Sequence, residues 1–158
     1  MENKKEMLPC LVAMGTLDDI STIAQFQIEM AMESEGYVLS HDTIINGVTA
    51  VMNDTNKGRY IVAKIDGETV ASLMLTREWS DWNNCWYWWV QSVYVLPQHR
   101  ARGIYKAMYA YVKQMAVEEN VTQVRLYVDK GNTRAQKVYQ QLGMDECHYL
   151  MYEELIES

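Results

Sequence analysis

The chain has 158 residues, which suits a single domain spanning residues 1–158, and its 49% hydrophobic content excludes a disordered chain. Its formal net charge is −7. Such an acidic balance disfavours nucleic acid as a partner, because phosphate binding requires basic groups. The sequence contains neither an apolar run as long as a membrane span nor the apolar core of a signal peptide. We therefore expect no membrane partner.

Three cysteines, Cys10, Cys85 and Cys147, lie far apart and lack the spacing of metal ligands. An odd number of separated cysteines is typical of a reduced protein. We expect a cytoplasmic protein without a metal site.

The first half of the chain predicts one strand and two helices. Leu8–Met14 is apolar enough for a short strand. Thr16 begins a capping-box pattern that opens a helix to about Glu33. Ser40 is placed to cap a second helix, which ends near Asn53.

Three strands follow in the middle of the chain. Tyr60–Ile65 and Thr69–Thr76 flank Asp66-Gly67, a strong signal for a two-residue hairpin turn. Cys85–Val95 is rich in aromatic and β-branched residues and predicts the next strand.

The last third alternates helices and strands, with a little further pairing expected around Met144. Helical spacing of apolar residues and period-2 alternation predict, in order, a helix, a strand, a helix and a strand: Ile104–Glu119, Val124–Val128, Thr133–Leu142 and Cys147–Tyr152. A strand–helix–strand unit implies parallel pairing across its helix.

The segment Val93–Tyr109, VYVLPQHRARGIYKAMY, joins a strand to a helix through a basic turn. The first N–H groups of a helix have no intrahelical partner and lie at its positive end, so they can bind a phosphate group. Arg100, Arg102 and Lys106 add positive charge beside this turn. The pattern predicts a pyrophosphate-binding site.

Two blocks carry a family resemblance. Arg100–Tyr105 resembles the coenzyme A loop of the GNAT superfamily of N-acetyltransferases, Arg/Gln-x-x-Gly-x-Gly/Ala. Asn132–Ala135 and Val138–Met144 resemble the family's later motif, an Asn and Ala followed by a Tyr three residues before a Leu-Gly ending. The resemblance implies an α/β GNAT fold. Its mixed sheet would have six to seven strands splayed around the cofactor and about four flanking helices.

The resemblance also implies the activity: transfer of the acetyl group of acetyl-CoA to a primary amine, by direct attack in a ternary complex. The acceptor would be a small or peptidic amine, and dimers are common in such families. Residues 1–56 hold nine carboxylates against two lysines, while the rest of the chain holds twelve charges of each sign. These acids either form solvated helix faces or attract a cationic acceptor.

The implied coenzyme A site runs from the strand into the loop. The pantetheine arm would pair with the backbone of Val93 and Val95, and an N–H near Val93–Tyr94 would bind the acetyl carbonyl. The full set of implied cofactor-binding residues is Val93, Tyr94, Val95, Arg100, Ala101, Arg102, Gly103, Ile104, Tyr105, Lys106, Asn132, Ala135 and Tyr139.

Tyr105 stands where the family has Gly or Ala, and we expect the phosphate cradle to persist if its ring points away from the loop. Tyr139 matches the tyrosine that protonates the departing thiolate, which makes it the implied catalytic acid. Asn132 would either contact the pantetheine amide or cap its helix.

The general base is not identified by the sequence. Trp89 stands where many family members have a glutamate. Glu78, Asp81, the pair Glu29 and Glu33 on one helical face, or a chain of water molecules could take the proton. His41 and His148 are interpreted as ordinary histidines.

The acceptor site is predicted from carboxylates and aromatic side chains. An aromatic belt at residues 79–89 must be partly core, and Trp79 and Trp82, expected in the loop before the strand, could hold a cation over a ring. The candidate acceptor-binding residues are Glu29, Glu33, Tyr37, Glu78, Trp79 and Trp82.

Two other hypotheses remain open at this stage. A binding module of the same fold could retain the cofactor cradle but lack turnover, as Trp89 and Tyr105 suggest. A thiol or hydroxyl group could replace the amine as acceptor.

Overall fold

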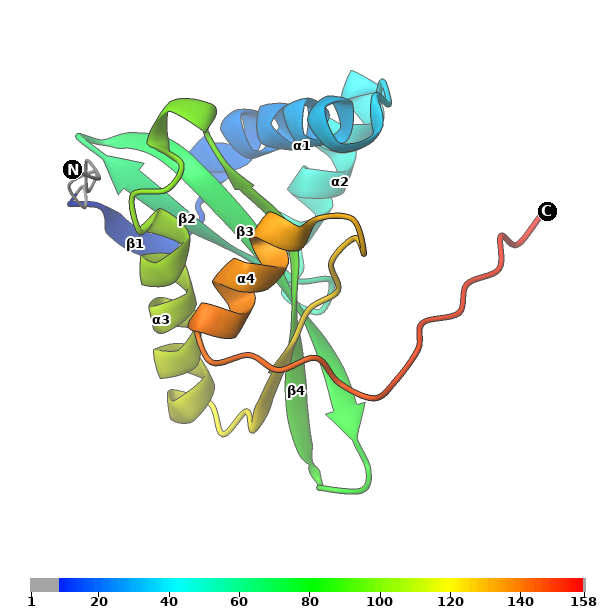
Figure 1. Ribbon diagram of the computed structural model, residues 1–158. Helices are drawn as coiled ribbons and strands as arrows, with labels where there is room; N and C mark the ends of the chain where they lie inside the picture. Colours follow the sequence, from blue (N-terminus) through cyan, green and yellow to red (C-terminus); the bar gives the residue numbers. More distant parts are fainter. Residues whose placement is uncertain (1–8, 158) are drawn as a thin grey trace. The chain divides into compact units, whose positions relative to one another are not determined.

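A computed structural model describes residues 9–157 (Figure 1). The chain forms two compact units, one ending at Tyr127 and the other beginning at Val128. The first unit contains the sheet and three helices, and the second contains helix α4, Thr133–Gln141, and the C-terminal segment.

The sheet of the first unit has five strands in the order β1-β2-β3-β4-β5. Neighbouring strands pair antiparallel except for β4 and β5, which are parallel as the sequence predicts. The strands are β1 Leu11–Met14, β2 Arg59–Ile65, β3 Glu68–Ser80, β4 Cys85–Val95 and β5 Gln123–Arg125.

The turn between β2 and β3 is the predicted two-residue hairpin. Asp66 and Gly67 have φ values of 50° and 80°. Positive φ at both positions gives the turn the twist that matches its flanking strands. The prediction of this hairpin is confirmed.

Helix α1, Ile20–Glu35, begins after a single 3₁₀ turn and ends at Gly36 in the left-handed conformation. The capping box is present, because the Asp19 carboxylate accepts a 2.8 Å hydrogen bond from the Thr16 backbone N–H. Helix α2, His41–Asn53, begins at Ser40, whose Oγ accepts from the Thr43 N–H.

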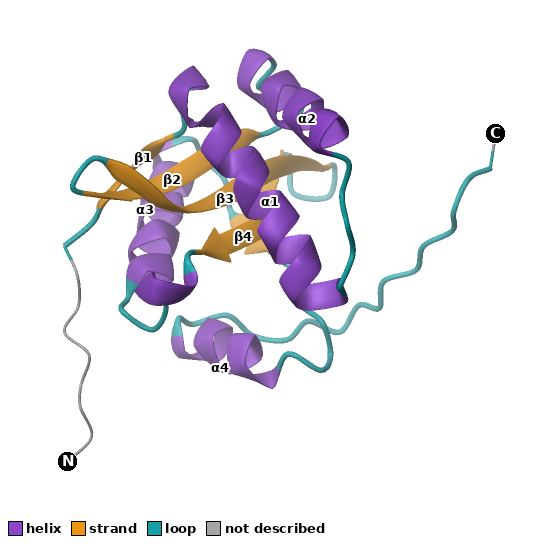
Figure 2. Ribbon diagram, turned by 90° about the horizontal axis from the view of Figure 1, so that it is seen from above, coloured by secondary structure: helices purple, strands orange, loops and turns teal. Residues whose placement is uncertain are grey.

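Helix α3, Ile104–Glu118, lies on the opposite face of the sheet from α1 and α2 (Figure 2). The apolar side chains accordingly form two clusters. Leu73 and Trp88 pack with Met108 and Val112 on the α3 face. The other face buries a second cluster beneath α1 and α2, formed by Ile23, Ala24, Val48, Tyr60 and Val62.

The predicted strand Cys147–Tyr152 is wrong, and so is the sheet of six to seven strands: among residues 9–157 the sheet has five. The segment has alternating apolar residues, but a strand also needs a neighbour to bond with its backbone. Here no ladder forms, and Tyr152 is 90% exposed. Strand β5 is likewise shorter than the predicted Val124–Val128.

Strand β3 is longer than predicted and continues past Thr76 to Ser80. Trp79 therefore lies in a strand, paired with Trp86, and not in a loop. Arg77 and Glu78, which are charged and not typical of a strand, are the reason that the sequence did not predict this extension. No helix among the described residues is long and apolar enough to span a bilayer.

Candidate active site

Strand β4 contains a β-bulge in the segment predicted to meet the acetyl group. Met74 pairs with Gln91 and Ser72 with Tyr94, so that Ser92 and Val93 together oppose Leu73. Ser92 has φ 52°, an uncommon conformation for a non-glycine residue. A bulge leaves backbone groups of the extra residue outside the ladder. These groups are therefore available to a substrate.

The parallel ladder between β4 and β5 is short. It ends at the pair Trp89 and Arg125, whereas β4 continues to Val95. Val90–Val95 thus extends beyond the ladder on that edge. An extended ligand can pair with such an edge through backbone hydrogen bonds.

The turn from β4 to α3 presents backbone N–H groups at the helix tip. Ala101 and Gly103 have φ values of 61° and 78°. Gly103 is the N-cap, and it has no side-chain capping bond. The first intrahelical bond runs from the Ala107 N–H to the Gly103 carbonyl, which leaves the N–H groups before Ala107 without intrahelical partners. This arrangement of left-handed residues before a helix is suited to an anion.

Two side-chain nitrogens at this turn are buried without a hydrogen-bond partner among residues 9–157, Nε of Arg102 and Nδ1 of His99. Buried polar groups are normally paired, so these atoms point to a missing ligand. The Lys106 side chain is exposed one turn into the helix. The residues present therefore fit a pyrophosphate group.

Tyr105 does not point away into solvent, but its ring lies along the helix. It stacks on Tyr109 with ring centroids 6.2 Å apart and packs against the core cluster on the α3 face. The ring is thus directed along the side of α3 and not beyond its N-terminal tip.

Arg100 is engaged within the first unit. Its Nε donates to the Val95 carbonyl at 2.8 Å, and its Nη2 donates to Glu33 at 2.7 Å. The guanidinium also lies 5.3 Å from the centre of the Tyr94 ring. Arg100 therefore links the end of β4 to α1 through these two hydrogen bonds.

The Tyr94 hydroxyl contacts Glu29 Oε2 at 2.9 Å and Glu33 Oε1 at 3.1 Å. The phenol has a single proton, so the hydroxyl donates a hydrogen bond to only one of the two carboxylates at a time. Burial raises the pKa of Tyr94 well above its ordinary value, and both carboxylates add to the shift. These side chains line a groove of about 520 Å³ between α1 and the end of β4.

Glu78 is placed far from the bulge. It lies five residues beyond Leu73 on β3, which corresponds to about 16 Å along a strand. Its carboxylate accepts a hydrogen bond from Trp89 Nε1 at 2.9 Å and forms an ion pair with Arg125 at 3.0 Å. Trp89, at the position where many family members have a glutamate, thus hydrogen-bonds to the Glu78–Arg125 ion pair.

The aromatic candidates also lie apart from the bulge. Trp79 meets Trp86 edge to face at 5.0 Å, toward the far end of the β3–β4 hairpin. Trp82 is 89% exposed in the turn of that hairpin, and Asp81 is exposed beside it. Tyr37 is exposed in the link between α1 and α2.

The second unit contains the later motif. The Asn132 side chain accepts a hydrogen bond from the Ala135 N–H at 3.1 Å, which caps α4. Ala135 and Tyr139 lie four residues apart and share one helical face. Burial raises the pKa of the Tyr139 phenol, so it carries its proton at neutral pH.

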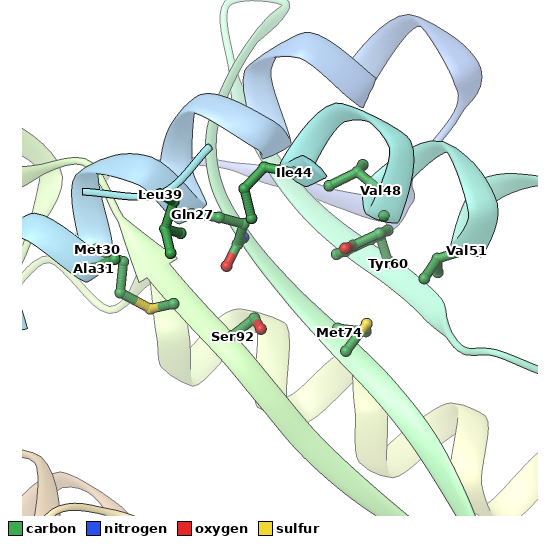
Figure 3. Close-up of a pocket in the computed structure, with 11 residues that line it drawn as sticks. Gln27, Met30, Ala31, Leu39, Ile44, Val48, Val51, Tyr60, Met74 and Ser92 are labelled. Carbon is green, nitrogen blue, oxygen red and sulfur yellow. The ribbon is translucent and has the colours of Figure 1, made fainter. Parts of the chain in front are cut away.

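A cavity that no motif in the sequence predicts lies under α1 and α2. Its volume is about 400 Å³, and it reaches Ser92 of the bulge (Figure 3). Gln27 is 93% buried beside it, and its Nε2 has no hydrogen-bond partner among residues 9–157. The sequence feature that could have indicated this cavity is Gln27, a polar residue on the apolar face of α1. No metal-binding group of three or more His, Cys, Asp or Glu occurs in that part of the chain.

Comparison with known proteins agrees with this geometry. The model of the Acetyltransferase (GNAT) family matches residues 24–144. An uncharacterized N-acetyltransferase of Archaeoglobus fulgidus is 24% identical over 123 residues, which cover 77% of this chain and 84% of the relative. The crystal structure of a possible acetyltransferase from Clostridium difficile 630 is 39% identical, with a TM-score of 0.88, 94% of this chain covered and 99% of that chain.

A more distant structure shares the fold. AAC(6')-Iy in complex with the bisubstrate analogue CoA-S-monomethyl-acetylneamine has a TM-score of 0.76 at 16% identity, covering 94% of this chain and 99% of that chain.

Proposed function

This chain belongs to the GNAT family of acetyltransferases, and from that premise we propose that it moves the acetyl group of acetyl-CoA to a primary amine by direct attack in a ternary complex. The observation that carries the proposal is the continuity of three features along β4 and α3. The bulge at Ser92 lies within the edge Val90–Val95, and a 3₁₀ turn and a basic loop lead from that edge to the tip of α3.

Coenzyme A would lie along this line. The pantetheine arm would pair with the backbone of Val93 and Val95 beyond the end of the ladder. The pyrophosphate would accept hydrogen bonds from the N–H groups of the helix tip, and the buried Nε of Arg102 would gain the partner it lacks. Lys106 would add charge at the rim. The acetyl-CoA thioester supplies the activated acyl group.

The chemistry then requires one bond to form and one to break. The lone pair of the neutral amine attacks the carbonyl carbon, the C–S bond breaks so that the sulfur leaves as a thiolate, and the nitrogen loses one proton to become the amide. A free N–H at the bulge donates to the carbonyl oxygen as negative charge develops there, which stabilises the transition state more than the ground state. Tyr139, the tyrosine that matches the family motif, would protonate the thiolate, and the proton lost by the nitrogen would then restore the phenol.

An alkyl ammonium must lose a proton before it can attack. Two carboxylates contact β4 beside the bulge, because the Tyr94 hydroxyl lies 2.9 Å from Glu29 Oε2 and 3.1 Å from Glu33 Oε1. We assign them as the final proton acceptors, reached through water. Glu29→Gln should lower kcat by about tenfold or more and alter its pH profile, while Glu35→Gln, at the exposed end of α1, should not.

The experiment that tests the proposal measures free thiol released from acetyl-CoA across a panel of amines, with coenzyme A binding measured in parallel. Amine-dependent release supports the transferase. Coenzyme A binding without release for any acceptor would favour a silent acyl-CoA-binding module. Absence of coenzyme A binding would overturn both.

A further inference from the structure

The cavity beneath α1 and α2 has no role in binding coenzyme A as proposed above. Its wall comes from both helices, from the link between them and from strands β2, β3 and β4. Its lining residues are Gln27, Met30, Ala31, Leu39, Ile44, Gly47, Val48, Val51, Tyr60, Met74 and Ser92. None of these side chains carries a formal charge at neutral pH.

We propose that this cavity binds the non-reacting part of the acceptor, and that the acceptor is an amine with an uncharged, mainly hydrocarbon body and one hydrogen-bond-accepting oxygen. The proposal rests on the proposed acetyl transfer and names its substrate class. It favours solvated helix faces over attraction of a cationic acceptor as the role of the N-terminal acids.

The position of the cavity connects it to the reaction. Ser92 is both a lining residue and part of the bulge, so an acceptor body in the cavity brings its amine to the bulge (Figure 3). Tyr94, two residues further along β4, carries the hydrogen bonds to Glu29 and Glu33. The apolar cavity and the two carboxylates therefore meet at one short stretch of strand.

The polar atoms of the cavity define what it recognises. Gln27 Nε2 is buried and lacks a partner among residues 9–157, although an amide nitrogen has two protons to donate. Such a donor is satisfied by a carbonyl or hydroxyl oxygen of a ligand. A buried, unpaired donor in the wall of a cavity indicates a site for a ligand.

The apolar part of the wall determines the body of the acceptor. Met30 and Met74 offer polarisable sulfur that contacts aromatic rings well. Ile44, Val48 and Val51 add branched aliphatic surface from α2. A polyamine would lose hydration of each ammonium in such a cavity without gaining a charged partner. The volume of about 400 Å³ is sufficient for an aromatic amine.

Gly47 provides a direct way to fill the cavity. It lies on α2, lines the cavity and is itself exposed, and a Cβ built on it meets no atom within 4 Å. A leucine there would narrow the open side of the cavity, and replacing a helical glycine does not strain the helix. Asn46, exposed on the same helix and outside the cavity lining, provides the matched control.

The experiment measures acetylation of L-phenylalaninamide, 2-phenylethylamine and spermidine by the full chain and three variants. The wild type should prefer the two aromatic amines to spermidine in kcat/KM. Gly47→Leu should raise KM for both aromatic amines by about tenfold and leave coenzyme A affinity unchanged, whereas Asn46→Leu should change neither. Gln27→Met should lower kcat/KM about 3- to 10-fold for L-phenylalaninamide, which has a carbonyl, and leave 2-phenylethylamine unchanged.

Preference for spermidine, or turnover insensitive to Gly47→Leu, would overturn this inference while leaving acetyl transfer intact. Failure to bind coenzyme A would overturn the proposed function instead. The thermal unfolding temperature of each variant distinguishes loss of activity caused by a filled cavity from loss caused by a destabilised fold.

Discussion

The hydroxyl of Tyr94 donates to Glu29 on α1 at 2.9 Å, and this contact joins the bulged strand to the helix above it. Glu33 is the second carboxylate on the same hydroxyl, and Arg100 neutralises it from the other side at 2.7 Å. The wall of the candidate active site is thus held by a network of charged and polar groups that starts next to the bulge.

Tyr94→Phe should lower the free energy of unfolding by about 1–3 kcal/mol, because it leaves two carboxylates without their shared donor.

Burial and the two carboxylates raise the pKa of Tyr94, so above pH 10 the unfolded chain releases the phenol proton while the folded chain keeps it. Stability should therefore fall above pH 10, by up to about 1.4 kcal/mol per pH unit. Denaturant unfolding between pH 8 and 11 should show this slope in the wild type and a reduced slope in Tyr94→Phe. Equal slopes would contradict the network.

Arg102→Glu should weaken coenzyme A binding by about 10- to 100-fold, because it replaces a half-buried cation at the helix tip by an anion. Lys113→Glu makes the same charge change further along α3, where the lysine is exposed. Titration calorimetry with coenzyme A measures both. Unchanged affinity in Arg102→Glu, or an equal loss in both variants, would show that the turn does not bind the pyrophosphate.

Asp19→Asn should destabilise the fold by about 1–3 kcal/mol at pH 7, since the Asp19 carboxylate completes the capping box and bonds to Thr69. Burial raises the pKa of Asp19, but hydrogen bonds from Thr16 and Thr69 and the charge of Lys64 outweigh it and hold the pKa below its ordinary value. The stabilisation is therefore present above about pH 4 and is lost as the pH falls through the lowered pKa.

Urea unfolding at pH 7 and at pH 3 checks this, with Asp18→Asn, an exposed neighbour, as the control. The difference between wild type and Asp19→Asn should shrink at pH 3. A difference that stays constant with pH would refute the assignment.

Tyr139→Phe should reduce kcat far more than it reduces coenzyme A affinity, because it removes the proposed proton donor to the thiolate and leaves the ring. The expected loss is about 10²-fold or more in kcat. Tyr152→Phe removes a hydroxyl from a tyrosine that is 90% exposed and should have no effect. Steady-state kinetics measure kcat, and titration calorimetry measures coenzyme A affinity. A wild-type kcat in Tyr139→Phe would exclude the proposed role of Tyr139 as the acid.

Local signals predicted most of the fold. Ser40, Asp66-Gly67 and the capping box each fix a helix start or a turn through chemistry within a few residues, and each is confirmed. The strand Cys147–Tyr152 failed because alternation describes faces, while a ladder depends on a distant partner. The extension of β3 to Ser80 was missed for a related reason, since pairing with β4 outweighs its polar composition.

The site was predictable only in part. The basic turn at Arg100–Tyr105 was predictable because its glycine and its cations are neighbours in the sequence, directly before the start of a helix. The engagement of Arg100 by Glu33, and that of Glu78 by Arg125, joins residues far apart in the chain. The cavity beside Gln27 exists only once two helices and the sheet are packed together.

The most direct measurement is a ¹H–¹⁵N NMR titration of the full chain with acetyl-CoA. Coenzyme A bound along β4 should produce large, saturable shifts of the backbone N–H signals of Val93 at the bulge and of Ile104 and Tyr105 at the tip of α3. Saturable binding that leaves these three signals unmoved, or no shifts at all, would contradict this binding mode.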